Sequence, residues 1–163
     1  MNAKEAIQTA LNSNHFVLKT YLNDMSDADL LVRALSGTNH IAWQLGHLIN
    51  SEQQLLSAVP GAPAAELPAG FAEQHSKETA SMEPPQGFLT KNEYLQLFDK
   101  VREATLAATN QLSEQDLDKP NTGPLAQFAP TIGHLLLLIA NHETMHSGQF
   151  VAIRRKLGKP VLI

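Results

Sequence analysis

The sequence predicts an all-α protein that folds as a four-helix bundle with its helices in up-down-down-up order. Four stretches of about 20 residues carry apolar side chains at every third or fourth position, which places them on one face of a helix. Capping residues open these stretches, and glycine or proline closes them. A chain of 163 residues can bury one core, so we expect a single domain over residues 1–163.

The first helix is expected over residues 3–22, where the apolar positions form a continuous stripe. After it, Ser26 and Asp29 have the spacing of a capping box. They predict a short helical turn that reaches Leu35, and Gly37 breaks it. The second long helix is expected to begin near residues 38–39.

The second helix ends at Val59, because Pro60 and Gly61 stop it. Residues 60–89 then form a long connection rich in proline and glycine, with one helical turn near residues 71–77. Such a connection can cross the bundle, so the second and third helices can run parallel. The second and fourth helices can then face each other.

A capping box at residues 90–93 opens the third helix, which is expected over residues 91–112. After another loop rich in proline and glycine, the fourth helix is expected over residues 130–157. Gly158 suits the position that follows its last turn.

Composition excludes several classes of partner and site. The net charge is −4, and the one basic cluster, residues 154–156, lies at an expected helix end, so we expect no nucleic-acid partner. The absence of cysteine excludes disulfides and thiolate ligands. The longest apolar run, residues 135–140, is too short to cross a membrane, and residues 1–5 lack the apolar core of a signal peptide. The default expectation is a cytoplasmic protein without a membrane partner.

Two of the seven histidines, His142 and His146, lie four residues apart on the fourth helix. On a helix this spacing turns the two rings about 40° apart and one turn along the axis, so they can chelate one metal ion. The residues from His142 to His146 also match H-E-x-x-H, the signature of zinc proteases. Such proteases need a third ligand downstream, and no Asp, Glu or His follows His146. The protease hypothesis is therefore rejected.

The third ligand must lie upstream, and His47 is the best candidate. It follows Gly46 among the apolar residues of the second helix, where an imidazole needs a partner. His134 is rotated about 80° from His142 on an ideal helix and cannot easily share its metal.

The remaining histidines are expected to have other positions. His40 lies on nearly the same helix face as His47, two turns away, which predicts that it lines the same groove. His15 and His75 have no evident partners, so we expect both at the surface.

The chain resembles the DinB/YfiT-like superfamily over nearly its whole length. The resemblance rests on Trp43-x-x-x-His47, on His142-x-x-x-His146-x-Gly148-Gln149, and on the tail Arg154-Arg155-x-Leu157-Gly158-x-Pro160. It implies a DinB/YfiT-like up-down-down-up bundle with a divalent metal held by His47, His142 and His146. It also implies a homodimer. Some members of the family are transferases or isomerases that depend on low-molecular-weight thiols.

Three neutral imidazoles leave coordination positions free, as in a catalytic metal site. Histidine ligands suit Zn²⁺, Ni²⁺ and Fe²⁺, and also Cu²⁺, without selecting one of them. Such an ion can lower the pKa of bound water or of a bound thiol. A thiol cofactor would supply the thiol that a protein without cysteine lacks.

Several residues near these histidines are candidates for the pocket, and each has a structural alternative. Gln149 can bond a ligand or simply end the helix, and Trp43 can be pocket wall or core. Glu143 points about 100° from His142, so it can pair with a neighbouring helix or act as a base. Asn50 and Ser51 lie one turn after His47. No catalytic residue is identified.

Two hypotheses for the function remain. The first is a metal-dependent enzyme acting on a small-molecule substrate, such as a thiol-dependent S-transferase or a hydrolase-like enzyme. The second is a non-catalytic metal- or ligand-binding bundle with a stress-related or structural role, because no clear general acid or base is present.

Overall fold

The computed structural model describes residues 1–123 and 125–162. These described residues form seven helices and no strand. The helices are α1 (Ala3–Leu22), α2 (Asp27–Leu30), α3 (Ile41–Leu56), α4 (Phe71–Gln74), α5 (Lys91–Gln111), α6 (Glu114–Leu117) and α7 (Ile132–Lys156). The all-α prediction is confirmed. Within the described ranges, no helix combines the length and the apolar character that a membrane span needs.

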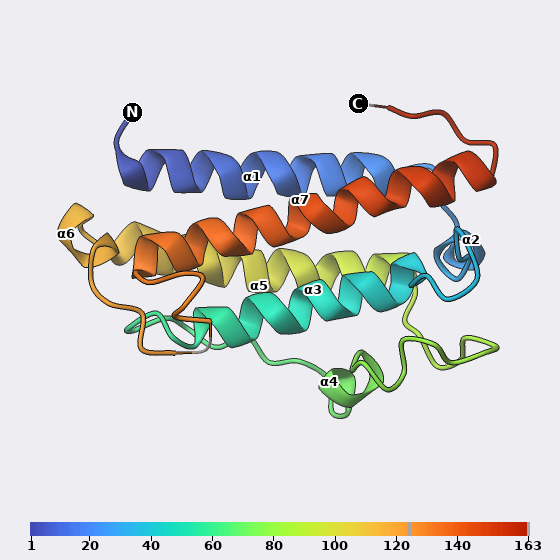
Figure 1. The fold of residues 1–163 in the computed structure, drawn as a ribbon, viewed down its shortest axis with the longest axis horizontal. Helices are drawn as coiled ribbons and strands as arrows, with labels where there is room; N and C mark the ends of the chain where they lie inside the picture. Colours follow the sequence, from blue (N-terminus) through green and yellow to red (C-terminus); the bar gives the residue numbers. More distant parts are fainter. Residues whose placement is uncertain (124, 163) are drawn as a thin grey trace.

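The four long helices lie side by side as a bundle (Figure 1). Helices α1 and α7 run in one direction, and α3 and α5 run in the other, which is the up-down-down-up order (Figure 1). Helix α1 packs against α7 and α5, and α3 packs against the same two helices. The long segment 57–90, which carries α4, connects the parallel helices α3 and α5 along the outside of the bundle (Figure 1).

Side-chain caps determine where the long helices begin. Capping boxes open α1 at Asn2 and α5 at Thr90. Helix α3 begins two to three residues later than the sequence suggests, because His40 is its cap: the imidazole Nδ1 accepts a hydrogen bond of 3.1 Å from the Trp43 amide. The same helix ends at Leu56, before Val59, and the last three residues continue as tight turns.

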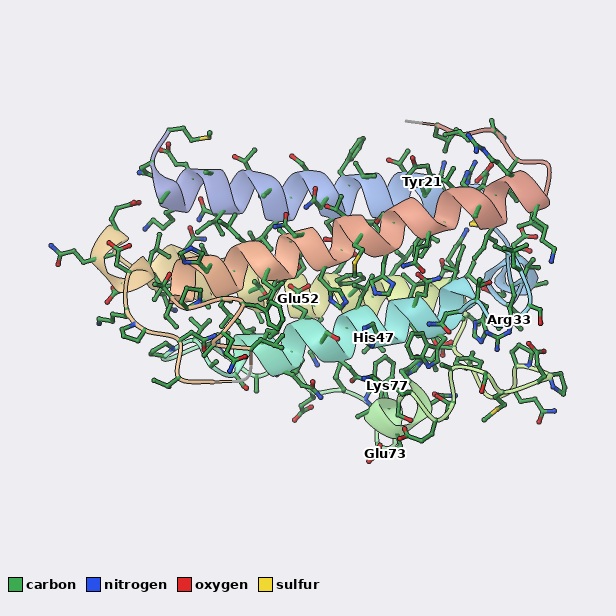
Figure 2. All side chains as sticks on the ribbon, in the orientation of Figure 1. Tyr21, Arg33, His47, Glu52, Glu73 and Lys77 are labelled. Carbon is green, nitrogen blue, oxygen red and sulfur yellow. The ribbon has the colours of Figure 1, made fainter. Side chains whose placement is uncertain are left out.

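The core consists of two apolar clusters, one toward each end of the bundle. The first contains Leu18, Leu45, Phe98 and Phe150, and the second contains Leu11, Leu56, Ala108 and Leu136. Between them the interior is polar. Figure 2 shows Glu52, a residue of this polar layer, near the middle of the bundle.

Arg102 is the centre of the polar layer. Its guanidinium donates to both carboxylate oxygens of Glu52, at 2.9 and 2.8 Å, and to Glu143 at 2.8 Å. Burial alone would lower the pKa of Arg102, but the charges of the two carboxylates outweigh it and raise the pKa above its ordinary value. Thr105 donates a further hydrogen bond to Glu52. These four charged or polar groups connect α3, α5 and α7, and their hydrogen bonds fix the positions of the three helices relative to one another.

Candidate metal centre

The fold brings His47, His142 and His146 together. One ring nitrogen from each lies within 4.8 Å of the other two. His142 and His146 come from successive turns of α7, and their Nε2 atoms are 3.2 Å apart. His47 comes from α3, which packs against α7, and its ring centroid is 5.1 and 5.2 Å from the other two centroids.

These separations fit a shared metal ion. Two nitrogens on one tetrahedral zinc lie roughly 3.4 Å apart, given metal–nitrogen bonds of about 2.0–2.1 Å. The two α7 nitrogens already have nearly this separation. The remaining separations are at most 4.8 Å, so an adjustment on the order of one ångström brings all three nitrogens into range. The donor set is chemically suited to a divalent transition metal.

Gln44 orients the ring of His146. The amide nitrogen of Gln44 donates to the carbonyl oxygen of Asn39 at 2.9 Å, so its Oε1 faces the other way and accepts. The His146 Nδ1 lies 2.8 Å from this oxygen and must therefore carry the proton. The Nε2 of His146 then carries a lone pair, and it lies 3.2 Å from the Nε2 of His142. A hydrogen bond of this kind fixes the tautomer of a metal-binding histidine.

Trp43 orients the ring of His47. The two rings are stacked, with an interplanar angle of 7° and a centroid separation of 4.9 Å. The indole nitrogen of Trp43 donates to the carbonyl oxygen of Ser76 at 3.0 Å. Trp43 is 4% exposed, so it belongs to the core and also supports one wall of the histidine cluster.

Burial keeps all three imidazoles neutral near pH 7. Desolvation, followed by the charge of His47, lowers the pKa of His142 to about 4. Desolvation, followed by His142 and His47, lowers the pKa of His146 to about 3. Desolvation, followed by the charge of Lys77, also lowers the pKa of His47. Neutral imidazole is the form that binds metal ions.

A cavity of about 460 Å³ opens beside the cluster. His47 and His142 form part of its wall, and the other described residues of the lining are Ser51, Gln54, Leu55, Lys77, Leu125 and Leu138. Figure 2 shows Lys77 between His47 and α4. A small molecule in this cavity would contact two of the three histidines.

The structure brings some of the other candidate residues to the cluster and not others. Ser51 lines the cavity. Asn50 is buried, and its amide reaches the carbonyl oxygen of Phe71 at 3.5 Å, so it contacts the α4 segment. Gln149 is exposed and lines a second cavity, of about 560 Å³, which Gln44 also lines.

Glu143 lies away from the three histidines. Its carboxylate is 1% exposed and accepts from Arg102, while its other oxygen lies 3.0 Å from His15 Nδ1. Adjacent residues of a helix point in different directions, and here His142 faces the cavity while Glu143 enters the polar layer.

Three expectations about the other histidines are wrong. His40 does not line the cavity, because its ring caps α3 and packs edge-on against Phe88. His15 is only partly exposed, at 12% of its side chain, and it does have partners: its Nε2 lies 2.7 Å from Asp99 and its Nδ1 lies 3.0 Å from Glu143. The third, His75, is described below. His134 is exposed and pairs with Thr131, at a distance from the cluster.

His75 is 2% exposed, and it fastens the α4 segment to the bundle. Its Nδ1 lies 2.7 Å from the carbonyl oxygen of Phe71, and its Nε2 lies 2.7 Å from the hydroxyl of Tyr94. The ring occupies the space left by the missing side chain of Gly46 on α3, where a Cβ would overlap it. The sequence shows no periodicity around residue 75, so only the packed structure reveals this role.

Sequence reasoning also missed Gln44 and Lys77. A signal for Gln44 was present, since it is an amide among the apolar positions of a core helix and needs a buried partner. No comparable signal marks Lys77, because its place depends on how a segment without regular periodicity folds back onto α3.

Comparisons with known proteins agree with this geometry. The model of the DinB superfamily matches residues 12–150, a range that contains all three histidines. A crystal structure of a conserved protein from Enterococcus faecalis superposes with a TM-score of 0.71 at 18% identity and covers 98% of this chain and 99% of that chain, which shows a common fold. None of the curated proteins matches the sequence. The family match spans most of the chain and the structural match extends over almost all of it, so the protein belongs to the DinB superfamily.

Proposed function

We propose that this protein is a divalent-metal-dependent enzyme that activates a low-molecular-weight thiol for transfer to a small electrophile. The observation that carries the proposal is the open side of the histidine cluster. No fourth His, Cys, Asp or Glu of the described residues joins the three imidazoles, and two of them face a cavity. Three protein ligands beside a free position are typical of catalytic rather than structural sites.

In this proposal His47, His142 and His146 hold the ion, and Zn²⁺, Ni²⁺ and Fe²⁺ are the candidates. When bound, such an ion supplies Lewis acidity that lowers the pKa of a thiol or of water in the cavity. Gln44 keeps the proton of His146 on Nδ1, and Trp43 holds the plane of His47. The apolar side chains of Leu55, Leu125 and Leu138 exclude water from the cavity wall.

Metal analysis of purified variants tests the site. His47→Ala should lower the bound metal from about one equivalent to a small fraction, because two imidazoles bind much more weakly than three. His134→Ala is the matched control, since it removes an exposed histidine that lies outside the cluster. Unchanged metal content in His47→Ala would show that the ligand assignment is wrong.

A conjugation assay tests the chemistry. Bacillithiol, mycothiol and glutathione are each supplied with an electrophile and with protein loaded with Zn²⁺, Ni²⁺ or Fe²⁺. The proposal expects a protein-dependent rate with at least one combination, and that rate should be lost in His142→Ala. If no combination gives such a rate, the transferase proposal fails even if the metal is bound.

The second candidate is a non-catalytic bundle that binds a metal or a small ligand. It is favoured by the position of Glu143, which points away from the cavity, so that no carboxylate of the described lining can act as a general base. A chelator that strongly lowers the melting temperature, combined with the absence of turnover, would support this candidate.

The family resemblance further supports a cytoplasmic homodimer, and sedimentation of the purified protein tests the dimer.

A further inference from the structure

Lys77 supplies the positive charge of the cavity beside the histidine cluster. No acidic side chain is present among the described lining residues. Lys77 makes no ion pair within 4 Å in the described part of the chain, although the neighbouring Glu78 is within electrostatic reach. The charge of Lys77 also reaches His47, whose pKa it helps to lower after desolvation. The ammonium group of Lys77 and two of the candidate metal ligands therefore line the same cavity.

Lys77 has a defined place because the segment that carries it is fastened to α3. Two residues before it, His75 is buried in the notch above Gly46 and bonded at both ring nitrogens. One residue before it, the carbonyl oxygen of Ser76 accepts from the indole of Trp43. Thr79 closes the turn by donating to the carbonyl oxygens of Gln74 and Ser76. These contacts fix the backbone at Lys77, and its exposed side chain extends from this fixed point along the cavity wall.

The rest of the lining divides into a polar part and an apolar part. Ser51 and Gln54, one turn apart on α3, offer a hydroxyl and an amide. Within the described part of the chain, the Ser51 hydroxyl has no hydrogen-bond partner. Leu55, Leu125 and Leu138 form the apolar part. The volume of about 460 Å³ suits a small organic molecule.

We infer that this cavity binds small carboxylate-bearing molecules, with the carboxylate at Lys77 and the opposite end of the molecule at the three histidines. This inference rests on the proposed function and names the substrate class of that site. One ammonium with a hydroxyl and an amide suits a monoanion. A phosphate dianion usually meets several cations, or the amides of a helix N-terminus, and Ser51, Gln54 and Leu55 instead lie in the C-terminal half of α3.

Binding of two matched thiols to the zinc-loaded protein tests the inference. The probes are 3-mercaptopropionate, which carries a carboxylate, and 3-mercaptopropan-1-ol, which is neutral and of similar size. Trp43 is the single tryptophan and stacks on His47, so its fluorescence reports events at the site. The dissociation constant of each probe is measured by titration for the wild type, Lys77→Met, Lys77→Arg and Lys119→Met. Lys119→Met is the matched control, because Lys119 pairs with Asp116 and is 63% exposed outside the cavity.

The wild type should bind the carboxylate probe at least about threefold more tightly than the alcohol, the size expected for one partly solvated charge pair. Lys77→Met should reduce this ratio toward one, whereas Lys77→Arg and Lys119→Met should preserve it. Added salt should weaken the preference of the wild type. A bound divalent ion also attracts anions, so only the comparison between variants assigns the preference to Lys77.

Two negative outcomes are distinguishable. If both thiols bind and the ratio is the same in Lys77→Met as in the wild type, the inference about Lys77 is overturned and the metal site stands. If zinc does not change Trp43 fluorescence and neither thiol binds, the proposed function fails, and the substrate assignment fails with it.

Discussion

A single methyl group at Gly46 should disrupt the support beneath the candidate site. Gly46 lies inside α3, and a Cβ built there would approach three ring atoms of His75 to less than 3.0 Å. Ordinary carbon contacts are about 3.5–4.0 Å, so the ring would have to move outward by roughly 1.5–2 Å. It cannot do so without losing its hydrogen bonds to Phe71 and Tyr94.

The size of the effect follows from three contributions. Overpacking in a buried site costs about 1–3 kcal/mol. Loss of the two hydrogen bonds of His75 costs about 1 kcal/mol each. Alanine is better than glycine inside a helix by about 1 kcal/mol, which offsets part of the loss. Gly46→Ala should therefore lower the free energy of unfolding by roughly 2–4 kcal/mol, which corresponds to a fall in Tm of about 5–15 °C for a chain of this size.

Urea unfolding followed by Trp43 fluorescence measures this change. Gly148→Ala is the matched control, because Gly148 also lies inside a helix and has open space where a Cβ would be. The control should be neutral or should stabilise the protein by about 0.5–1 kcal/mol. Removing the ring in Gly46→Ala/His75→Ala should make the two changes strongly non-additive. Equal stabilisation by Gly46→Ala and Gly148→Ala would refute the packing described here.

Three further predictions concern buried polar side chains. Gln44→Leu should weaken zinc binding about 10–100-fold in a chelator competition, because His146 loses the partner that fixes its tautomer. An unchanged zinc affinity would show that Gln44 does not support the metal centre. Arg102→Met should lower the free energy of unfolding in urea by about 3–5 kcal/mol, because Glu52 and Glu143 would remain buried without their cation; a loss below about 1 kcal/mol would contradict this account of the polar layer. Desolvation, and then the charge of Arg33, lowers the pKa of His40 from 6.5 to about 4. As the pH falls through this interval the unfolded chain takes up the proton first, so stability should decline by up to about 3 kcal/mol between pH 6.5 and 4. His40→Ser keeps a capping oxygen and cannot titrate, so its urea unfolding should show a flatter pH profile than the wild type.

Local sequence patterns were sufficient for the long helices and for two of the three histidines of the cluster. The capping boxes at Asn2 and Thr90 use residues within three positions of each other, so they can be identified without the fold. The pairing of His142 with His146 is likewise a property of one helix. His47 could be selected because a histidine beside Gly46 among apolar residues needs a partner.

The rest depends on how separate elements meet. Gln44 reaches His146 only because α3 and α7 cross at that point. His75 is buried only because Gly46, on another element, leaves room for it. Arg102 and Glu143 are buried in the polar layer only because they find partners on other helices. Such contacts between distant residues are not encoded in any local spacing.

The neighbours His142 and Glu143 give α7 a further property. One side chain faces the cavity while the next is tied to Arg102 between the two apolar clusters. The ligand-bearing turn is thus held by contacts that do not involve an ion. Zinc fingers, in contrast, need their metal in order to fold. If the centre holds an ion, as proposed, that ion would be exchangeable while the bundle stays folded. Its identity would then follow metal supply and coordination preference and would not be set during folding.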